Sequence, residues 1–208
     1  VGKGHHADYW KTEEQNLCAV FDRYVRSRIG ESTHFSVFGL APIPLLIRLG
    51  TLFTDKVPTQ VYQLRREPQQ TWQWSRALCD TEYRIRRPST FRHKPALIIS
   101  LSAAISRERV IAILGEKVSI WELMLRSPHN DSLRNHAQLA KFRVATRQLM
   151  LEIAKRHGNE KPLAIFPAMP VATAVEFGRV RMPKADSPWI IYDQNKMTGT
   201  FTKALHIK

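Results

Sequence analysis

A short pattern occurs twice in this chain, and the repetition restricts the fold more than any other feature. Residues 38–50 read Phe-Gly-Leu-Ala-Pro-Ile-Pro-Leu-Leu-Ile-Arg-Leu-Gly, and residues 166–178 read Phe-Pro-Ala-Met-Pro-Val-Ala-Thr-Ala-Val-Glu-Phe-Gly. A shift of 128 positions (166 minus 38) places aromatic on aromatic, proline on proline and glycine on glycine. Further along, a shift of 130 (192 minus 62) pairs Tyr62 with Tyr192. Two copies are too few for a solenoid, so the repeat predicts two joined halves of one fold.

Each copy predicts the same order of elements: a short strand, a proline turn, a short helix that stops at glycine, and a second strand. The first copy predicts a helix over 44–49 and a strand over 59–64, and the second predicts strands over 163–166 and 189–192. Strands that alternate with helices are typical of a parallel sheet of the Rossmann type. We therefore expect an α/β fold of two fused, pseudo-repeated lobes with largely parallel sheets. Because each turn follows the carboxyl end of its strand, a pseudo-two-fold relation would direct both turns toward one crevice.

The remaining apolar patterns predict further elements in a chain of 208 residues, which is enough for one large domain or two small lobes. Thr12-Glu-Glu-Gln15 has the form of a capping box and predicts the start of a helix that Gly30 ends. Asp131 or Ser132 is expected to cap a long helix that runs to about His157. The other expected elements are strands over 96–100, 118–123 and 201–207 and a helix over about 106–114.

The charge balance indicates an anionic partner. The chain has 32 Lys and Arg against 18 Asp and Glu, a formal net charge of +14, which attracts phosphates, nucleic acids or anionic surfaces. The longest apolar run, residues 43–53, is short and contains Arg48, so no membrane span is expected. Two distant cysteines, Cys18 and Cys79, form neither a zinc motif nor a disulfide framework, and they favour a reducing cytoplasm.

The motifs of the common catalytic and cofactor sites are missing from the sequence. Gly39 stands alone, so no G-x-G-x-x-G loop follows a strand, and no serine lies in a G-x-S-x-G pattern. Acidic residues are few and form no compelling pair for acid–base chemistry, and Asp193 after a strand is more typical of a structural aspartate. The sequence therefore predicts a binding module without metal or cofactor, and not an enzyme.

Several residues are candidates for contacting an anionic ligand. Trp72 and Trp74 lie two apart, so both point the same way in an extended segment, where they either stack on a base or pack into the core. Ser100 and Ser102 follow a buried strand and either hydrogen-bond a ligand or cap the next helix. Free amides at the two helix starts and nearby arginines are suited to phosphates. The other candidates lie on the two turns and after the strand that follows the first turn: Leu40, Pro42, Gln63, Arg65, Phe166, Pro167, Ala168, Met169 and Pro170.

Taken in order, these motifs resemble the SAVED domain, and the resemblance runs from about His34 to the end of the chain. The resemblance rests on residues 38–50, Val61-Tyr-Gln63, Trp72-Gln-Trp74, Phe166-Pro-Ala-Met-Pro170 with Glu176-Phe-Gly178, and Ile191-Tyr-Asp193. It implies two fused CARF-like units of the Rossmann type, most like the SAVED portion of HNH–SAVED nucleases. On this basis residues 34–208 are the SAVED domain, with lobes over about 34–94 and 95–208. Residues 1–33 are then a helix and a connection to an effector domain that this chain lacks.

The resemblance also implies a function, a cytoplasmic sensor in bacterial anti-phage signalling of the CBASS kind. Such a domain binds a cyclic oligonucleotide made by a CD-NTase, here expected to be a cyclic dinucleotide such as a cGAMP isomer. Binding drives self-association to a dimer or higher oligomer and switches on the fused effector, expected to be a DNA endonuclease, through which alone DNA is contacted. The alternatives are a cyclic trinucleotide ligand, a basic module that binds DNA or RNA directly, and a nucleotide-processing enzyme.

Overall fold

A computed structural model describes residues 7–31, 34–67, 69–77, 81–195 and 197–208, so Cys79 lies outside the described residues. The strands form a parallel pair, β1–β2, and a six-stranded sheet in the order β3-β5-β4-β6-β7-β8. In the larger sheet β4 to β7 run parallel, and the edge strands β3 and β8 are antiparallel to their neighbours. The expected α/β fold with largely parallel sheets is confirmed. The strands are β1 Phe35–Phe38, β2 Thr59–Tyr62, β3 Arg84–Arg86, β4 Lys94–Ser100, β5 Val118–Met124, β6 Leu163–Ala168, β7 Trp189–Gln194 and β8 Phe201–Ile207.

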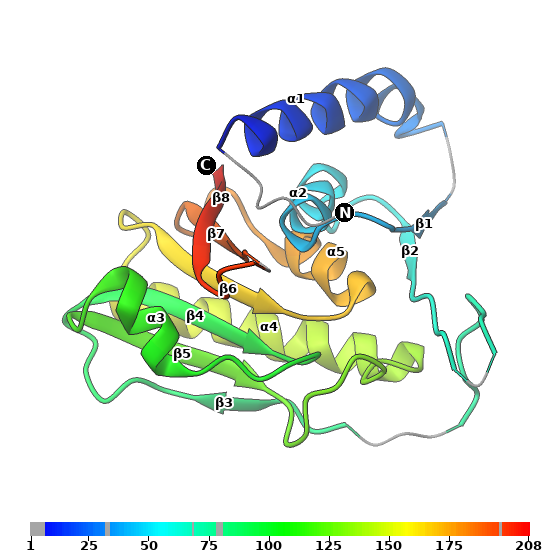
Figure 1. The fold of residues 1–208 in the computed structure, drawn as a ribbon. Helices are drawn as coiled ribbons and strands as arrows, with labels where there is room; N and C mark the ends of the chain where they lie inside the picture. The colour runs from blue at the N-terminus through cyan, green and yellow to red at the C-terminus, as the bar shows by residue number, and fades with distance from the viewer. Residues whose placement is uncertain (1–6, 32–33, 68, 78–80, 196) are drawn as a thin grey trace.

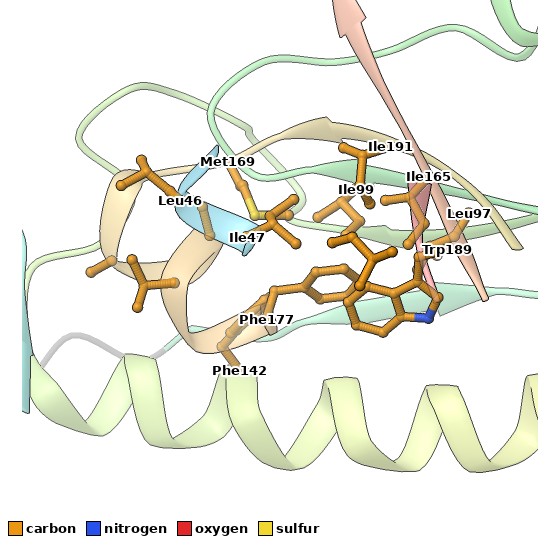
Figure 2. Packing of buried hydrophobic residues seen from close by; sticks show 14 of the residues in the cluster. Leu46, Ile47, Leu97, Ile99, Phe142, Ile165, Met169, Phe177, Trp189 and Ile191 are labelled. Carbon is orange, nitrogen blue, oxygen red and sulfur yellow. The ribbon is translucent and has the colours of Figure 1, made fainter. Parts of the chain in front are cut away.

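Helices cover both faces of the large sheet, which explains why its central strands are continuously apolar. The helices are α1 Ala7–Tyr24, η1 Arg26–Arg28, α2 Ile43–Phe53, α3 Arg107–Leu114, α4 His136–His157 and α5 Val171–Val180. On one face α4 and α5 bury Leu97 and Ile99 in the main core, and α3 lies over the other face (Figure 1). Figure 2 shows the main core, in which Phe177 stacks on Trp189 with ring centroids 4.6 Å apart.

The repeat seen in the sequence is present in the fold. β1-α2-β2 and β6-α5-β7 are the same strand–helix–strand unit, each with parallel strands. Their helices cross at the glycines that the repeat pairs: a Cβ on Gly50 would lie 2.0 Å from the Val175 carbonyl oxygen, and a Cβ on Gly178 would lie 2.0 Å from the Ile47 carbonyl oxygen. Val175 is the repeat partner of Ile47, so the contact is reciprocal, as a pseudo-two-fold axis requires.

Two predicted helix starts are wrong. α1 is already helical at Ala7, so Thr12 lies inside the helix and not at its cap. α4 begins at His136 with Asn135 as its N-cap, four residues after Asp131 (135 minus 131) and three after Ser132 (135 minus 132), the two predicted caps. There Asn135 and Gln138 form the capping box, with the Gln138 N–H donating to Asn135 Oδ1 (2.9 Å) and the Asn135 N–H donating to Gln138 Oε1 (3.1 Å).

The connection between β2 and β3 crosses from the small sheet to the large one (Figure 1). Its middle is fixed to the start of α4, because the Ser75 N–H donates to the Arg134 carbonyl (2.9 Å) and Asn135 Nδ2 donates to the Ala77 carbonyl (3.0 Å). β3 then pairs with β5 in the six-stranded sheet. Within the described part of the chain, no helix is both long and apolar enough to cross a membrane.

Candidate functional site

The two proline turns meet at one cavity of about 680 Å³, as the pseudo-two-fold arrangement predicted. The cavity lies beyond the carboxyl ends of β1, β2, β4 and β6, which is where open α/β sheets bind ligands. The first repeat contributes one side of the lining and the second repeat, with the loops after β4 and β5, contributes the other. The lining residues are Gly39, Leu40, Gln63, Leu64, Arg66, Glu67, Ser102, His129, Asn130, Asp131, Met169, Pro170 and Val171.

Hydrogen bonds across the cavity hold its two sides together. The Ala172 N–H, in the first turn of α5, donates to Gln63 Oε1 (3.0 Å), and Gln63 Nε2 donates to the Leu64 carbonyl (3.1 Å). The sequence predicted that free backbone N–H groups at each helix start would bind an anion. At the start of α5, however, the Gln63 side chain already accepts from one of these N–H groups. Gln63 therefore fixes the end of β2 against the second repeat, and these bonds set the orientation of its amide.

The turn of the second repeat is fixed in the same way. The Ala168 carbonyl accepts from the backbone N–H groups of Leu101 (2.8 Å) and Ser102 (3.0 Å). The His129 N–H donates to the Leu101 carbonyl (3.1 Å), which holds the loop after β5 over the cavity. These bonds satisfy the backbone of three loops at once, so the lining is preformed.

The charges of the lining are mixed. Among the lining residues of the described chain, Arg66 is the one Lys or Arg, and it is exposed to solvent. Glu67 and Asp131 contribute carboxylates, and Asp131 is paired with Arg134 at 2.8 Å. His129, Asn130 and Ser102 add hydrogen-bonding groups. A ligand with a phosphate for Arg66 and amino or hydroxyl donors for the carboxylates matches this set.

Five of the predicted site residues line the cavity: Leu40, Gln63, Ser102, Met169 and Pro170. Met169 was expected to contact the ligand. Met169 is only 3% exposed, and Figure 2 shows its side chain directed into the core toward Ile47. The Met169 thioether is therefore a packing group, and the sequence-based role for it is corrected.

The remaining candidates of the second repeat belong to the sheet and not to the cavity lining. Phe166 is fully buried on the α3 side, where its ring stacks on Tyr192, so a base cannot reach it. Ser100 is buried, and its Oγ accepts from the Ile105 N–H (3.1 Å), a bond that fixes the loop before α3. The N-cap residue of α3 is Ser106, which makes no side-chain cap bond. Pro167 and Ala168 are half-buried at the end of β6.

The remaining candidates of the first repeat and its connection also lie outside the lining. Pro42 is the N-cap residue of α2, and Arg65 exchanges two backbone hydrogen bonds with Thr71 (2.9 and 3.0 Å). The two tryptophans meet different neighbours: Trp72 lies edge-on to Phe38 (5.1 Å between ring centroids), and Trp74 lies 4.7 Å from the ring of His136. Trp74 also packs against the main core, so its indole serves packing.

Sequence reasoning missed the loop after β5, and it missed Arg66 and Glu67, which follow the predicted Arg65. Asp131 was considered only as a helix cap, and His129 and Asn130 were not among the candidates. The rule that ligands bind beyond the carboxyl ends of parallel strands applies to β5 as well as to β4 and β6, and it is the signal that would have identified this loop. Within the described residues, no group of three or more His, Cys, Asp and Glu is placed to hold a metal ion.

Solved structures with a similar fold include Cap4 receptors that contain a SAVED/CARF domain. The Cap4 SAVED/CARF-domain containing receptor of Acinetobacter baumannii, with the cyclic trinucleotide 3′3′3′-cAAA, matches with a TM-score of 0.67 and 14% identity, over 97% of this chain and 44% of that chain. The same receptor with 2′3′3′-cAAA matches with a TM-score of 0.67 and 13% identity, over 97% and 44%. The Cap4 receptor of Moraxella osloensis matches with a TM-score of 0.62 and 13% identity, over 98% and 43%. This chain thus spans less than half the length of these receptors.

No curated protein sequence matches this chain. The family model of the SAVED domain, the SMODS-associated and fused to various effectors sensor domain, matches residues 18–207. That match includes both strand–helix–strand units and every residue of the cavity lining. It agrees with the motif order read from the sequence and with the fold of the Cap4 receptors. The chain belongs to the SAVED sensor-domain family.

Proposed function

We propose that this chain is a sensor that binds a cyclic oligonucleotide in the cavity between its two repeated units. The observation that carries the proposal is that both proline turns of a SAVED domain meet at one preformed cavity of about 680 Å³. This volume is within the range of sites that enclose most of a small ligand. A ligand held between two pseudo-equivalent turns is itself expected to be built from repeated nucleotides.

Each side of the lining has a role in this proposal. The guanidinium of Arg66 pairs with a phosphate, and Ser102 and Asn130 hydrogen-bond base edges or riboses. Leu40 and Val171 supply apolar contact from the two repeats. Gln63 keeps the two sides at a fixed separation through its bond to the Ala172 N–H.

The ring size is the finer part of the proposal. The Cap4 receptor of Acinetobacter baumannii, solved with two cyclic trinucleotides, supports a ligand of three nucleotides for this chain. A cyclic dinucleotide such as a cGAMP isomer, expected from the sequence, stays a prediction and belongs in the same experiment. The supplier would be a CD-NTase, and the compartment the cytoplasm.

The output of the sensor is proposed from the family resemblance. Residues 34–208 form the sensor, with lobes over about 34–94 and 95–208, although β3 at the end of the first lobe pairs with β5 in the sheet of the second. Residues 1–33 connect the sensor to an effector. Ligand binding drives self-association and activates that effector, for which a DNA endonuclease is the expected activity. In this scheme the chain itself does no chemistry on its ligand.

We expect Arg66→Ala to weaken binding of 3′3′3′-cAAA about ten- to hundred-fold, because it removes a charge-assisted hydrogen bond to phosphate. Arg76→Ala is the matched control, since Arg76 is exposed and lies outside the lining. Isothermal titration calorimetry at two salt concentrations, with 3′3′-cGAMP as the second probe, measures the affinities. Thermal shift confirms binding, because a ligand of the folded state stabilises it by mass action.

A basic module that binds DNA or RNA directly is the second candidate, favoured by the net charge of +14. Several arginines are already in ion pairs, including Arg87 with Glu152 and Arg147 with Asp55, which lowers the charge available to a nucleic acid. No thermal shift with any cyclic di- or trinucleotide, together with DNA affinity that rises with length and falls steeply with salt, would favour this candidate and overturn the sensor proposal.

A further inference from the structure

Two groups of three aromatic rings occupy equivalent places in the two repeats. In the first repeat Phe38 stacks on Tyr62, with ring centroids 4.5 Å apart and planes at 6°, and Trp72 meets Phe38 edge-on at 5.1 Å and 86°. In the second repeat Phe166 stacks on Tyr192 at 4.5 Å and 11°, and Phe201 meets Phe166 edge-on at 5.1 Å and 86°. The third ring of each group comes from a different place in the chain, and the geometry is nevertheless the same.

The two groups differ in their exposure. Phe166 is fully buried, because Ile105 and Val110 from the α3 region lie over that face of the sheet. Phe38 is 53% exposed, and Leu40 beyond it is 74% exposed. A single exposed apolar side chain is ordinary. Here, in contrast, a phenyl ring is held rigidly by two other rings and left open to solvent, beside an exposed leucine.

This exposed ring is next to the cavity. Leu40 lines the cavity and follows Phe38 by two positions, a separation of about 7 Å at the rise of an extended chain. A cavity of about 680 Å³ is of the size that encloses a drug-sized ligand. A cyclic oligonucleotide of three nucleotides carries three bases and three phosphates, so part of such a ring would extend past the rim.

We propose that Phe38, braced by Tyr62 and Trp72, is a platform on which one base of the cyclic oligonucleotide stacks where the ring extends past Leu40. The proposal rests on the proposed function and adds a contact outside the cavity. A base offers a flat π-face, and Phe38, which is 53% exposed and fixed by its neighbours, can contact that face with little loss of side-chain freedom. The contact favours larger cyclic oligonucleotides over smaller ones, because an oligonucleotide that fits entirely within the cavity does not reach Phe38.

The test uses two variants of one residue and a matched control. Phe38→Leu keeps the apolar character and removes the ring, Phe38→Trp keeps a stacking ring, and Tyr24→Leu removes an aromatic ring of similar exposure from α1. With 3′3′3′-cAAA as the probe in calorimetry, we expect Phe38→Leu to lose about ten-fold in affinity. Phe38→Trp and Tyr24→Leu should bind like the wild type. Phe38→Leu should lower the affinity for cyclic di-AMP by less than it lowers the affinity for the trinucleotide.

Each other outcome separates this proposal from the proposed function. If the wild type binds 3′3′3′-cAAA and Phe38→Leu binds it equally well, the platform is wrong and the sensor proposal stands. If the wild type binds neither probe, both are overturned. If Phe38→Leu keeps its affinity but has a lower mass in sedimentation equilibrium than the wild type, the aromatic face joins copies of the chain and does not bind a base. Thermal unfolding of each variant shows whether the fold is retained.

Discussion

Gly178→Ala is expected to lower the free energy of unfolding by about 3 kcal/mol, the upper end of the range for overpacking a core. The added Cβ would lie 2.0 Å from the Ile47 carbonyl oxygen and 2.9 Å from the Gly50 Cα. Both atoms belong to a helix backbone, so no side-chain rotation relieves the clash, and α2 and α5 must separate. Urea unfolding followed by circular dichroism measures the loss.

Two further glycine variants make the test specific. Gly50→Ala should cost about as much as Gly178→Ala, since the crossing is reciprocal and its Cβ meets the Val175 carbonyl oxygen at 2.0 Å. Gly30→Ala is the control: its φ of 101° strains any other residue, but nothing lies within 4 Å of the new Cβ. It should cost about 1–2 kcal/mol of backbone strain. If Gly178→Ala costs no more than Gly30→Ala, the close helix crossing is wrong.

The crossing also positions the cavity. Close approach of α2 and α5 brings the turn before α2 against the start of α5, where a Cβ on Gly39 would lie 3.0 Å from Val171 Cγ1. Gly39, Leu40, Pro170 and Val171 then line the same space. Glycine at the crossing therefore serves the site as well as stability, because helices held further apart would separate the two turns.

The repeat predicted the fold well because its prolines and glycines determine the path of the backbone. Proline turns and glycine stops set where each strand and helix ends, and Gly50 and Gly178 occupy equivalent positions because the same helix crossing needs both. What the repeat does not specify is what covers each unit. Phe38 and Phe166 are equivalent in sequence, yet only Phe166 lies beneath the α3 region, which has no counterpart in the repeat.

Helix starts failed for a different reason. Thr12-Glu-Glu-Gln15 and Asn135-His-Ala-Gln138 both have the form of a capping box, and only the second forms one. The pattern is local, whereas the choice depends on what precedes it: α1 is already helical at Ala7, and the loop before Asn135 is held by the His129 N–H bond to the Leu101 carbonyl. The same tertiary bond places residues 129–131 in the cavity, which no local pattern predicts.

Arg179→Met is expected to cost about 3–5 kcal/mol of stability, because it removes a buried charge that several groups depend on. Arg179 is 5% exposed and donates to the carbonyls of Thr54 (3.1 Å), Val57 (3.0 Å) and Thr59 (3.2 Å). It also donates to Glu176 Oε2 (3.1 Å), whose residue is 2% exposed. The guanidinium thus ties α5 to the connection between α2 and β2. Methionine fills similar space but removes all four of these bonds, although the Val57 carbonyl still accepts from Thr59 Oγ1 (2.9 Å) and Glu176 still accepts from Arg143 Nε (2.6 Å).

A matched surface variant and a double variant isolate the buried charge as the cause. Arg147→Met breaks a half-exposed pair with Asp55 (3.1 Å) and should change the free energy of unfolding by less than about 1 kcal/mol. Without Arg179, the buried Glu176 carboxylate keeps its pair with Arg143 (2.6 Å) but loses the second. Adding Glu176→Gln to Arg179→Met removes this charge, so the double variant should lose less stability than the two single losses combined. If the two losses are strictly additive, the bonds to the carbonyls and not the ion pair hold α5. If Arg179→Met loses no more stability than Arg147→Met, neither the carbonyl bonds nor the ion pair holds α5. Chemical denaturation of all four variants under one buffer condition decides between these outcomes.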